Sequence, residues 1–387
     1  MEYKRYPYDY LHKFSFEVMK KLGISEEDAH IPGEALLKAD LMGDPSHGII
    51  RLKRYTWRLD NNLINRKPKM SVTIETPSFI SYDADNGLGQ VAGYKAMNLC
   101  MDKAMKSGIA IAHVRRTNHI GKCGYYSMLA LKRDMIGISM MNASCLVAPT
   151  FGIEPLIGTN PMALAAPAGK EPPFCLDMAT SVRAYGRVDI RNREGREIPL
   201  GWGLDHEGKV TIHPKDILGT AGYAKSGGQR GTMLPLGGFG DETAGYKGYG
   251  LALVVDILTG VLAGGLWGGN LALGFDEKVA GLTHLVGAIN IEAFRPLNEF
   301  KKDMDAMMRK LKDSKKARGY NYTYKEIEDG YQITMKRRKE PYERIYVPGE
   351  RGLELEKEQM KNGVRLGDYV IKELEAINKQ YNMGYEF

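Results

Sequence analysis

Apolar residues recur at helical spacing near both ends of the chain. Residues 9–24 and 25–42 carry this pattern, and Ser25 followed by three acidic residues is typical of a helix start. Charged amphipathic patterns over 296–312 and 366–378 predict further helices. Both ends of the chain are therefore expected to be mainly helical.

Between these ends, short apolar stretches alternate with turn residues. The predicted strands are 72–75, 79–83, 109–114, 136–141, 144–149, 162–167 and 174–178, and the predicted helices are 92–106, 125–133 and 245–262. Since strands and helices alternate, the pattern predicts an α/β domain.

A second alternating stretch, residues 319–345, interrupts the helical C-terminal part. Its pattern predicts two strands that turn at Asp329-Gly330, a favoured hairpin pair, and that add surface or contact with a second subunit. A lid is the less favoured alternative. Residues 347–351 are expected to form a polar turn.

Composition sets broad limits. The 387 residues suffice for two domains, and the net charge of +7 is modest, with much of the excess in 301–318 and 336–339. No basic stretch resembles a nucleic-acid motif, so we expect no nucleic-acid partner. Four widely spaced cysteines, no signal peptide and no apolar run of membrane-spanning length predict a soluble, cytoplasmic protein without membrane attachment.

The most reactive set of side chains lies just after the second predicted helix. Pro45 and Gly48 flank Ser46-His47, which places this pair on a turn or at a helix start, and Arg51 follows about one turn later. A neutral imidazole accepts a proton near pH 7, and a guanidinium binds a carboxylate through two hydrogen bonds. The alternative is that Ser46 caps a helix and that His47 and Arg51 are ordinary surface residues.

A second histidine follows a predicted strand. His119 lies between Asn118 and Gly121, at the kind of strand end where α/β proteins place site residues. Two histidines make a cleft with two proton carriers plausible. A metal site is the rival, but no third ligand stands at a recognisable spacing, so we expect no metal.

Glycines and small residues indicate where an anionic ligand binds. Asp177 to Ser181 follow a strand, and Gly245 to Gly250 open an apolar helix with Lys247 in its first turn. The chain has neither a G-x-G-x-x-G fingerprint nor a phosphate loop of the G-x-x-x-x-G-K-[ST] type. A nucleotide site, if present, differs from the ordinary Rossmann type.

Across about residues 10 to 370, the order of these motifs resembles the malate/L-lactate dehydrogenase family of the second, non-Rossmann type. That family includes ureidoglycolate and sulfolactate dehydrogenases, diketogulonate reductase and piperideine-carboxylate reductases. The motifs are Asp44-Pro-Ser46-His47-Gly48-x-x-Arg51, Asp85-Asn-Gly-x-Gly-Gln90, Asn118-His119-x-Gly121, Gly158-Thr-Asn-Pro161, Asp177-Met-Ala-Thr-Ser181, Gly201-Trp202, Lys247-Gly-Tyr-Gly250 and Pro348-Gly-Glu350.

The resemblance implies an NAD- or NADP-dependent oxidoreductase that interconverts a small 2-hydroxy acid and its 2-oxo acid and works as a homodimer. It implies a non-Rossmann α/β domain with a mixed sheet, residues 76–295, and a helical domain made from 1–75 and 296–387. Its acid/base histidine falls on His47, ranked before His119, with Ser46 beside it. The implied substrate contacts are Arg51, Asn142 and Ser144, and the implied cofactor contacts are Cys175, Asp177, Met178, Thr180, Ser181, Tyr246, Lys247, Gly349, Glu350 and Arg351.

Several alternatives stay open at this point. An imine reductase that makes cyclic amino acids would use the same cofactor and a similar carboxylate anchor, and ureidoglycolate or sulfolactate are alternative substrates. A binding protein without activity is less favoured, because the candidate histidines and Lys247 are all in place. Residues 237–244 depart from the family pattern through the acidic pair Asp241-Glu242. The sequence does not choose between NAD and NADP.

Overall fold

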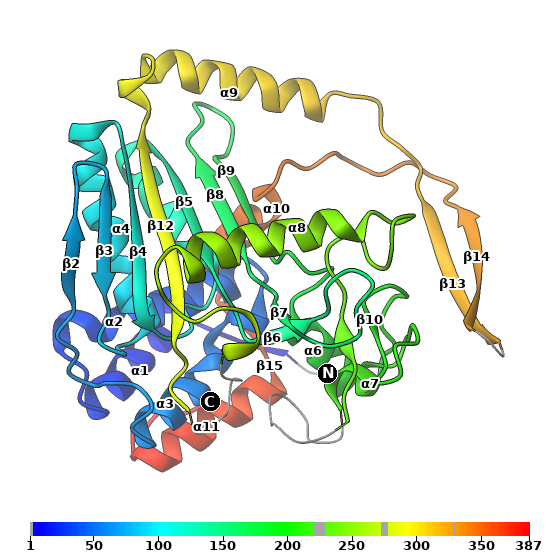
Figure 1. Cartoon of the computed structure of the whole chain (residues 1–387), viewed down its shortest axis with the longest axis horizontal. Helices are drawn as coiled ribbons and strands as arrows, with labels where there is room; N and C mark the ends of the chain where they lie inside the picture. The colour runs from blue at the N-terminus through cyan, green and yellow to red at the C-terminus, as the bar shows by residue number, and fades with distance from the viewer. Residues whose placement is uncertain (1–2, 220–228, 272–277, 328–329) are drawn as a thin grey trace.

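A seven-stranded mixed sheet forms the centre of the computed structural model, which describes residues 3–219, 229–271, 278–327 and 330–387 (Figure 1). The β3–β4 pair is parallel, and the other neighbours in this sheet are antiparallel. In spatial order the strands are β2 (Ser71–Glu75), β3 (Phe79–Asp83), β4 (Ile109–Thr117), β12 (Leu282–Asn290), β5 (Met135–Met141), β8 (Met162–Ala166) and β9 (Phe174–Met178). The α/β prediction is confirmed.

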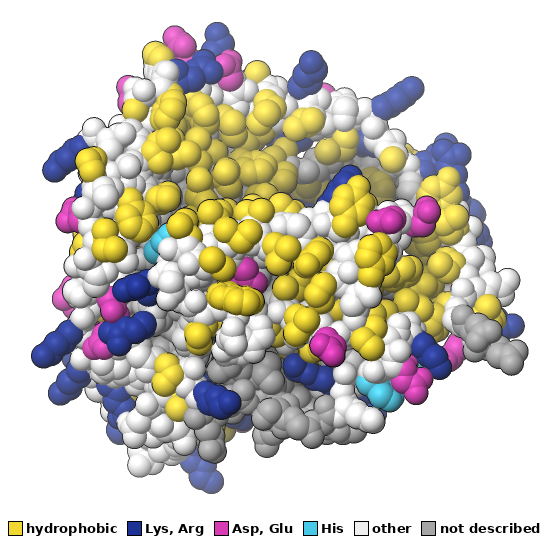
Figure 2. Space-filling model, in the orientation of Figure 1, with side chains coloured by type: hydrophobic (Ala, Val, Ile, Leu, Met, Phe, Trp, Pro, Cys, Tyr) yellow, Lys and Arg dark blue, Asp and Glu magenta, His cyan; other side chains and the backbone are white. Residues whose placement is uncertain are grey.

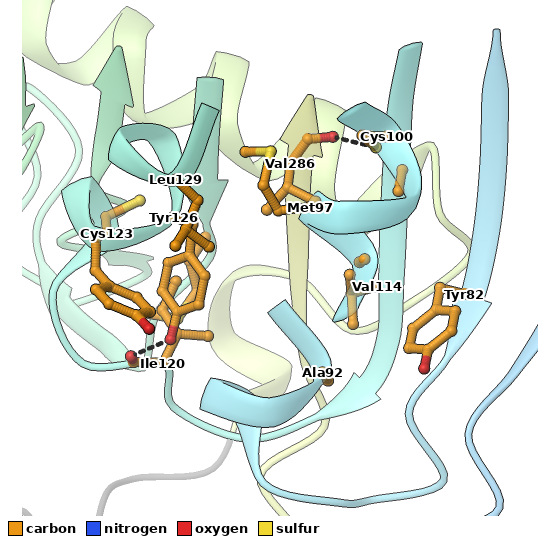
Figure 3. Packing of buried hydrophobic residues seen from close by; sticks show 14 of the residues in the cluster. Tyr82, Ala92, Met97, Cys100, Val114, Ile120, Cys123, Tyr126, Leu129 and Val286 are labelled. Carbon is orange, nitrogen blue, oxygen red and sulfur yellow. Dashed lines mark hydrogen bonds between the residues drawn. The ribbon is translucent and has the colours of Figure 1, made fainter. Parts of the chain in front are cut away.

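The central strand β12 is absent from the sequence-based prediction. Its first seven residues are all buried, so apolar and polar positions do not alternate along it. Helices α4 (Gly89–Ser107) and α5 (Cys123–Leu129) pack on this sheet, and the 3₁₀ turn Ala130–Arg133 continues α5. Figure 3 shows Met97, Tyr126 and Val286 in this core, where the Cys100 thiol donates to the Val286 carbonyl at 3.6 Å.

Helices from both ends of the chain share a second core. They are α1 (Tyr8–Lys21), α2 (Glu26–Leu41), α3 (Leu52–Asp60) and α11 (Asp368–Tyr381). The strands β1 (Tyr3–Tyr6) and β15 (Val364–Gly367) pair antiparallel and join the two ends. The prediction that the last helix begins at Leu366 was therefore wrong by two residues, because Leu366 pairs with Lys4 instead.

Helix α9 (Leu297–Lys312) confirms the pattern over 296–312 but lies apart from that helical core (Figure 1). The Asp305 carboxylate at its centre accepts three backbone N–H groups from residues 169–171, at 2.8 to 3.1 Å. This anchors α9 beside the turn between β8 and β9. The division into domains 1–75 with 296–387 and 76–295 stays a prediction.

A second, smaller sheet and three helices complete the part of the chain around the candidate site. The sheet runs β10 (Gly203–Leu204), β11 (Thr232–Met233), β6 (Cys145–Val147) and β7 (Ile157–Gly158), and the helices are α6 (Tyr185–Arg193), α7 (Pro214–Leu218) and α8 (Gly245–Asp256). A π-helical turn, Ile257–Val261, extends α8. No helix among the described residues is long and apolar enough to cross a membrane.

Two further expectations concern the C-terminal part. The hairpin is confirmed as β13 (Tyr320–Ile327) and β14 (Gly330–Arg337), although Asp329 of its expected turn lies outside the described residues. The polar turn over 347–351 was wrong in its second half, because Glu350 begins helix α10 (Glu350–Asn362). Gly349, with a φ of +93°, ends the turn, and Glu350 places an acidic side chain in the first turn of that helix.

His284 on β12 provides a test of how the buried sheet responds to acid. Its Nε2 lies 3.0 Å from the Asn118 carbonyl oxygen, and burial lowers its pKa to about 3. Between that value and about 6.5 the unfolded chain binds a proton that the native protein does not, so stability rises with pH over this window. We expect His284→Gln to flatten this dependence by about one proton in urea unfolding at several pH values. The exposed His206→Gln is the control, and an unchanged slope in His284→Gln would contradict the prediction.

Candidate active site

The loop between α2 and α3 carries the predicted catalytic pair. It contains two 3₁₀ turns, Pro45–His47 and Ile49–Arg51, separated by Gly48. The prediction that Ser46 and His47 lie on a turn is confirmed. Ser46 is buried and caps no helix through its side chain, which argues against the capping alternative.

Asp44 is a functional candidate that the sequence analysis missed. Its Oδ2 lies 3.2 Å from His47 Nδ1, and Ser46 Oγ donates to Asp44 Oδ1 at 2.8 Å. Because the Ser46 proton goes to Asp44, the Ser46 oxygen is left to accept from His47 Nδ1 at 3.1 Å. Both contacts require a proton on His47 Nδ1, so in the neutral ring Nε2 carries no proton and is able to accept one. The sequence feature that could have indicated Asp44 is a carboxylate three residues before a histidine in a tight turn.

The charge of Asp44 is stabilised by its neighbours. Burial alone would raise the pKa of this carboxyl, but His47, Lys122 and the Ser46 hydroxyl hold it well below the usual range. Lys122 also pairs with Asp177 at 2.8 Å, and Gly124 N–H donates to the same oxygen at 2.9 Å. Lys122, absent from the prediction, thus links the His47 loop to β9.

The structure brings His119 to His47. The two rings are nearly parallel, with an interplanar angle of 12° and centroids 5.9 Å apart. His119 Nδ1 accepts the Gly121 N–H at 3.1 Å and lies 2.7 Å from the Tyr55 hydroxyl. Since a backbone N–H only donates, Nδ1 carries no proton and neutral His119 holds its proton on Nε2. Burial, followed by the charge of Arg54, lowers the pKa of His119 well below 6.5, which favours this neutral donor form.

Arg51 is hydrogen-bonded to the main chain of Ser46. Its Nε donates to the Ser46 carbonyl at 2.6 Å, and Gly186 at the start of α6 approaches both residues so closely that a Cβ there would lie 3.1 Å from Arg51 Nη2. A cavity of about 110 Å³ opens beside them. Half of the residues that line it are charged, among them Arg51, Lys53, Arg54 and Arg193, and neither histidine lines it.

The two other predicted substrate contacts differ from one another. Asn142 is buried, and its amide accepts from Thr283 N–H at 2.9 Å and donates to the Leu266 carbonyl at 2.8 Å. These bonds connect the C-terminal end of β5 to the first residues of β12. Ser144 is half-buried just before β6.

The three predicted cofactor segments are linked by backbone hydrogen bonds. Cys175 N–H donates to the Pro348 carbonyl at 3.1 Å, which joins β9 to the turn before α10. Leu236 accepts from Gly248 N–H and donates to the Thr180 carbonyl, which joins the end of β9 to the start of α8. The remaining predicted contacts on these segments are Asp177, Met178, Ser181, Tyr246, Lys247, Gly349, Glu350 and Arg351.

In the cofactor segment 349–351, the Glu350 side chain is already engaged in ion pairs. Glu350 is buried and pairs with Lys312 at 3.1 Å and Arg344 at 2.7 Å. These charges and the Val347 N–H outweigh burial and lower its pKa. Tyr246 and Lys247 are exposed at the start of α8, and Lys247 is thus placed to bind an anion.

Comparisons with known proteins cover nearly the whole chain. Residues 6–340 match the family model described as malate/L-lactate dehydrogenase. A malate dehydrogenase of Pyrococcus abyssi is 42% identical over 379 residues, which are 98% of this chain and 95% of that protein. An L-sulfolactate dehydrogenase of Methanocaldococcus jannaschii is 38% identical over 310 residues, 80% of this chain and 84% of the relative.

A solved structure agrees with this assignment. The crystal structure of malate dehydrogenase from Entamoeba histolytica superposes with a TM-score of 0.88 at 32% identity, covering all of both chains. The chain therefore belongs to the malate/L-lactate dehydrogenase family and is an oxidoreductase of hydroxy acids.

Proposed function

We propose that the protein interconverts a small 2-hydroxy acid and its 2-oxo acid, with malate and oxaloacetate as the first pair to test. The observation that carries this proposal is the Asp44–Ser46–His47 arrangement, which fixes a proton on Nδ1 and leaves Nε2 to exchange one. The malate dehydrogenase from Pyrococcus supports the choice of malate.

In the reducing direction, His47 Nε2–H gives a proton to the substrate carbonyl oxygen, and Asp44 stabilises the protonated ring before the transfer. His119 Nε2–H donates a hydrogen bond to the same oxygen as negative charge develops on it. A reduced nicotinamide, when bound, supplies a hydride to C2 of the acid. In the oxidising direction, neutral His47 takes the hydroxyl proton.

Arg51 binds the substrate carboxylate in this proposal. A guanidinium donates two parallel hydrogen bonds to a carboxylate. The bond from Arg51 Nε to the Ser46 carbonyl holds the guanidinium beside the loop that carries His47. The fixed fork also orients C2 of the acid relative to His47.

The dinucleotide binds, in our proposal, where the three linked segments meet. Gly349 has a φ of +93°, and a Cβ on it would lie 2.6 Å from Cys175 Cβ, so the turn packs against β9 only as glycine. Backbone N–H groups of such a turn, with Arg351 two residues further along and Lys247 on the linked segment at the start of α8, suit the phosphates of a dinucleotide. Assays with NADH and with NADPH distinguish NAD from NADP as the cofactor.

A homodimer is also part of the proposal. On the outer side of α8 and its π-helical extension, Val254, Ile257, Val261 and Leu262 are each between 44% and 62% exposed. Figure 2 shows apolar side chains gathered over the face where Figure 1 draws α8. A large exposed apolar patch marks a protein interface, and a second copy of the chain is the proposed occupant.

The testing experiment follows absorbance of reduced nicotinamide, with NADH and then NADPH, against oxaloacetate, pyruvate, sulfopyruvate, oxalurate and a cyclic imino acid. Consumption with one 2-oxo acid supports the proposal and identifies cofactor and substrate together. Consumption only with the cyclic imine would replace it by the imine reductase alternative, and none with any compound would contradict it.

Gly349→Ala tests the dinucleotide site separately. The added methyl group would overlap Cys175 and force the turn away from β9, so we expect the dissociation constant of the dinucleotide to rise about tenfold or more. Fluorescence titration of the reduced dinucleotide measures this effect. The control is Gly195→Ala, which imposes the same kind of backbone strain at a φ of +63° but meets no atom within 4 Å. Equal affinities in the two variants would contradict the assigned site.

A further inference from the structure

Both ends of the loop that carries Ser46 and His47 are fastened to the last turn of α2. At the first end, Asp44 N–H donates to the Ala39 carbonyl at 2.8 Å. At the second end, Ile49 N–H donates to Asp40 Oδ2 at 2.6 Å. The first hydrogen bond joins two backbone groups, whereas the second depends on the Asp40 side chain. Asp40 therefore holds the second end of the loop against α2.

The Asp40 carboxylate also occupies the space where a side chain of residue 48 would lie. A Cβ built on Gly48 would be 1.9 Å from Asp40 Oδ1 and 2.3 Å from its Cγ. The backbone of Gly48, with a φ of −79° and a ψ of −162°, is open to any residue. Glycine is therefore required here because the carboxylate approaches the main chain, not because of backbone strain.

The end of α2 is itself held from the C-terminal part of the chain. Buried Gln359 on α10 donates to the carbonyl oxygens of Asp40 and Leu41 at 2.9 and 3.0 Å. Its own amide oxygen accepts Arg365 N–H at 2.7 Å. The end of α2 is therefore held in place by α10, and Asp40 in turn holds the loop to the end of α2.

We infer that Asp40 is a positioning residue, which acts through Ile49 and Gly48 to hold His47 against Asp44 and opposite His119. Asp40 has no assigned part in binding substrate or cofactor. The inference rests on the proposed function insofar as it names His47 as the acid/base group. The positioning itself concerns only the geometry of residues 44–49, which is independent of the reaction.

The acceptor oxygen, not the negative charge, carries this role. Burial raises the pKa of Asp40 to about 8, aided by the charge of Asp44 and opposed by the Ile49 N–H bond. The neutral acid is consequently favoured at pH 7, and its carbonyl oxygen still accepts from Ile49. An asparagine offers the same acceptor on the same carbon skeleton.

The test compares Asp40→Ala with Asp40→Asn. For Asp40→Ala we expect kcat to fall about 10- to 100-fold with little change in dinucleotide affinity, since a misplacement of about 1 Å costs this much. Its pH–rate profile should also shift to lower pH, because a His47 ring displaced from Asp44 is no longer stabilised in its protonated form. Asp40→Asn should stay within about threefold of the wild type in kcat and in dinucleotide affinity. A wild-type kcat and pH profile in Asp40→Ala, or equal losses in both variants, would overturn the inference.

Asp305→Ala is the matched control for lost stability. Asp305 is another buried carboxylate that accepts backbone N–H groups, but its partners are residues 169–171 rather than the catalytic loop. This variant should lower the melting temperature without moving the pH–rate profile. If Asp40→Ala does not fold, Gly48→Ala gives the same readouts, because its methyl group would displace the carboxylate.

A second readout does not depend on turnover. The ¹⁵N chemical shifts of the His47 ring report which nitrogen carries the proton, and a His47→Gln sample assigns them. We expect Asp40→Ala to lose the preference for Nδ1–H and Asp40→Asn to keep it. If the wild type reduces no acid but the shifts change in this way, the proposed function fails and the positioning role stands. Unchanged shifts in Asp40→Ala would overturn the role even in an active enzyme.

Discussion

His47→Ala is expected to lower kcat by a factor of about 10² to 10⁴, the usual contribution of a positioned proton carrier. The affinity for dinucleotide should stay near normal, because the predicted cofactor contacts lie on other segments. Steady-state rates with oxaloacetate or the best 2-oxo acid, together with a dinucleotide titration, measure both quantities. The exposed His206→Ala is the control and should behave as the wild type.

His119 variants make this prediction sharper. If His119 acts as a neutral donor through Nε2, as proposed, His119→Gln, which keeps an N–H donor, should lose less activity than His119→Ala. His47→Gln should be nearly as impaired as His47→Ala, since an amide does not exchange a proton near pH 7. Near-normal turnover of His47→Ala with inactive His119 variants would reverse the two roles.

Asp44→Asn has the second largest expected effect, a loss of about 10² to 10⁴ in kcat. The amide is able to donate to His47 Nδ1, which favours the tautomer with its proton on Nε2 and blocks the nitrogen that must accept the substrate proton. The loss should therefore be greater for oxidation of the hydroxy acid than for reduction of the oxo acid. Rates in both directions over pH 5 to about 9 measure this difference.

Acid stability supplies an independent check on Asp44. The pKa of this carboxyl is depressed in the folded protein, so its contribution to stability is present above the unfolded value near 3.9 and is lost as pH falls below it. Asp44→Asn should flatten that part of the stability curve. Wild-type rates in both directions would show that Asp44 does not set the tautomer.

The loop around His47 was the part of the site most readable from sequence, and the reason is local. Pro45 and Gly48 restrict the chain within a few residues, so the turn follows from composition alone. The approach of His119 to His47 depends on where β4 ends relative to α3, which no local pattern records. Asp44 was missed for a related reason, since its contact with His47 exists only in the 3₁₀ geometry.

The fold shows the same division between local and distant causes. Helices α1 and α9 were predicted closely because each exposes one face and buries the other, and α2 because Ser25 and three acidic residues mark its start. The strand β12 was not, because a strand buried on both faces has no alternation. Helix α10 was missed where Gly349 and Pro348 suggested a turn, since its position is fixed by partners far away in sequence, such as Lys312 for Glu350.

The pairing of β1 with β15 has a consequence for how the enzyme is made. The loop that carries Ser46 and His47 ends by residue 51, yet the strand that pairs with β1 and the Gln359 amide that holds the end of α2 come more than 300 residues later. During synthesis on the ribosome, the support of this loop is therefore incomplete until residues 359–367 have been added. Contacts so distant in sequence close slowly. The nascent chain thus acquires the full support of the His47 loop only after residues 359–367 have been made.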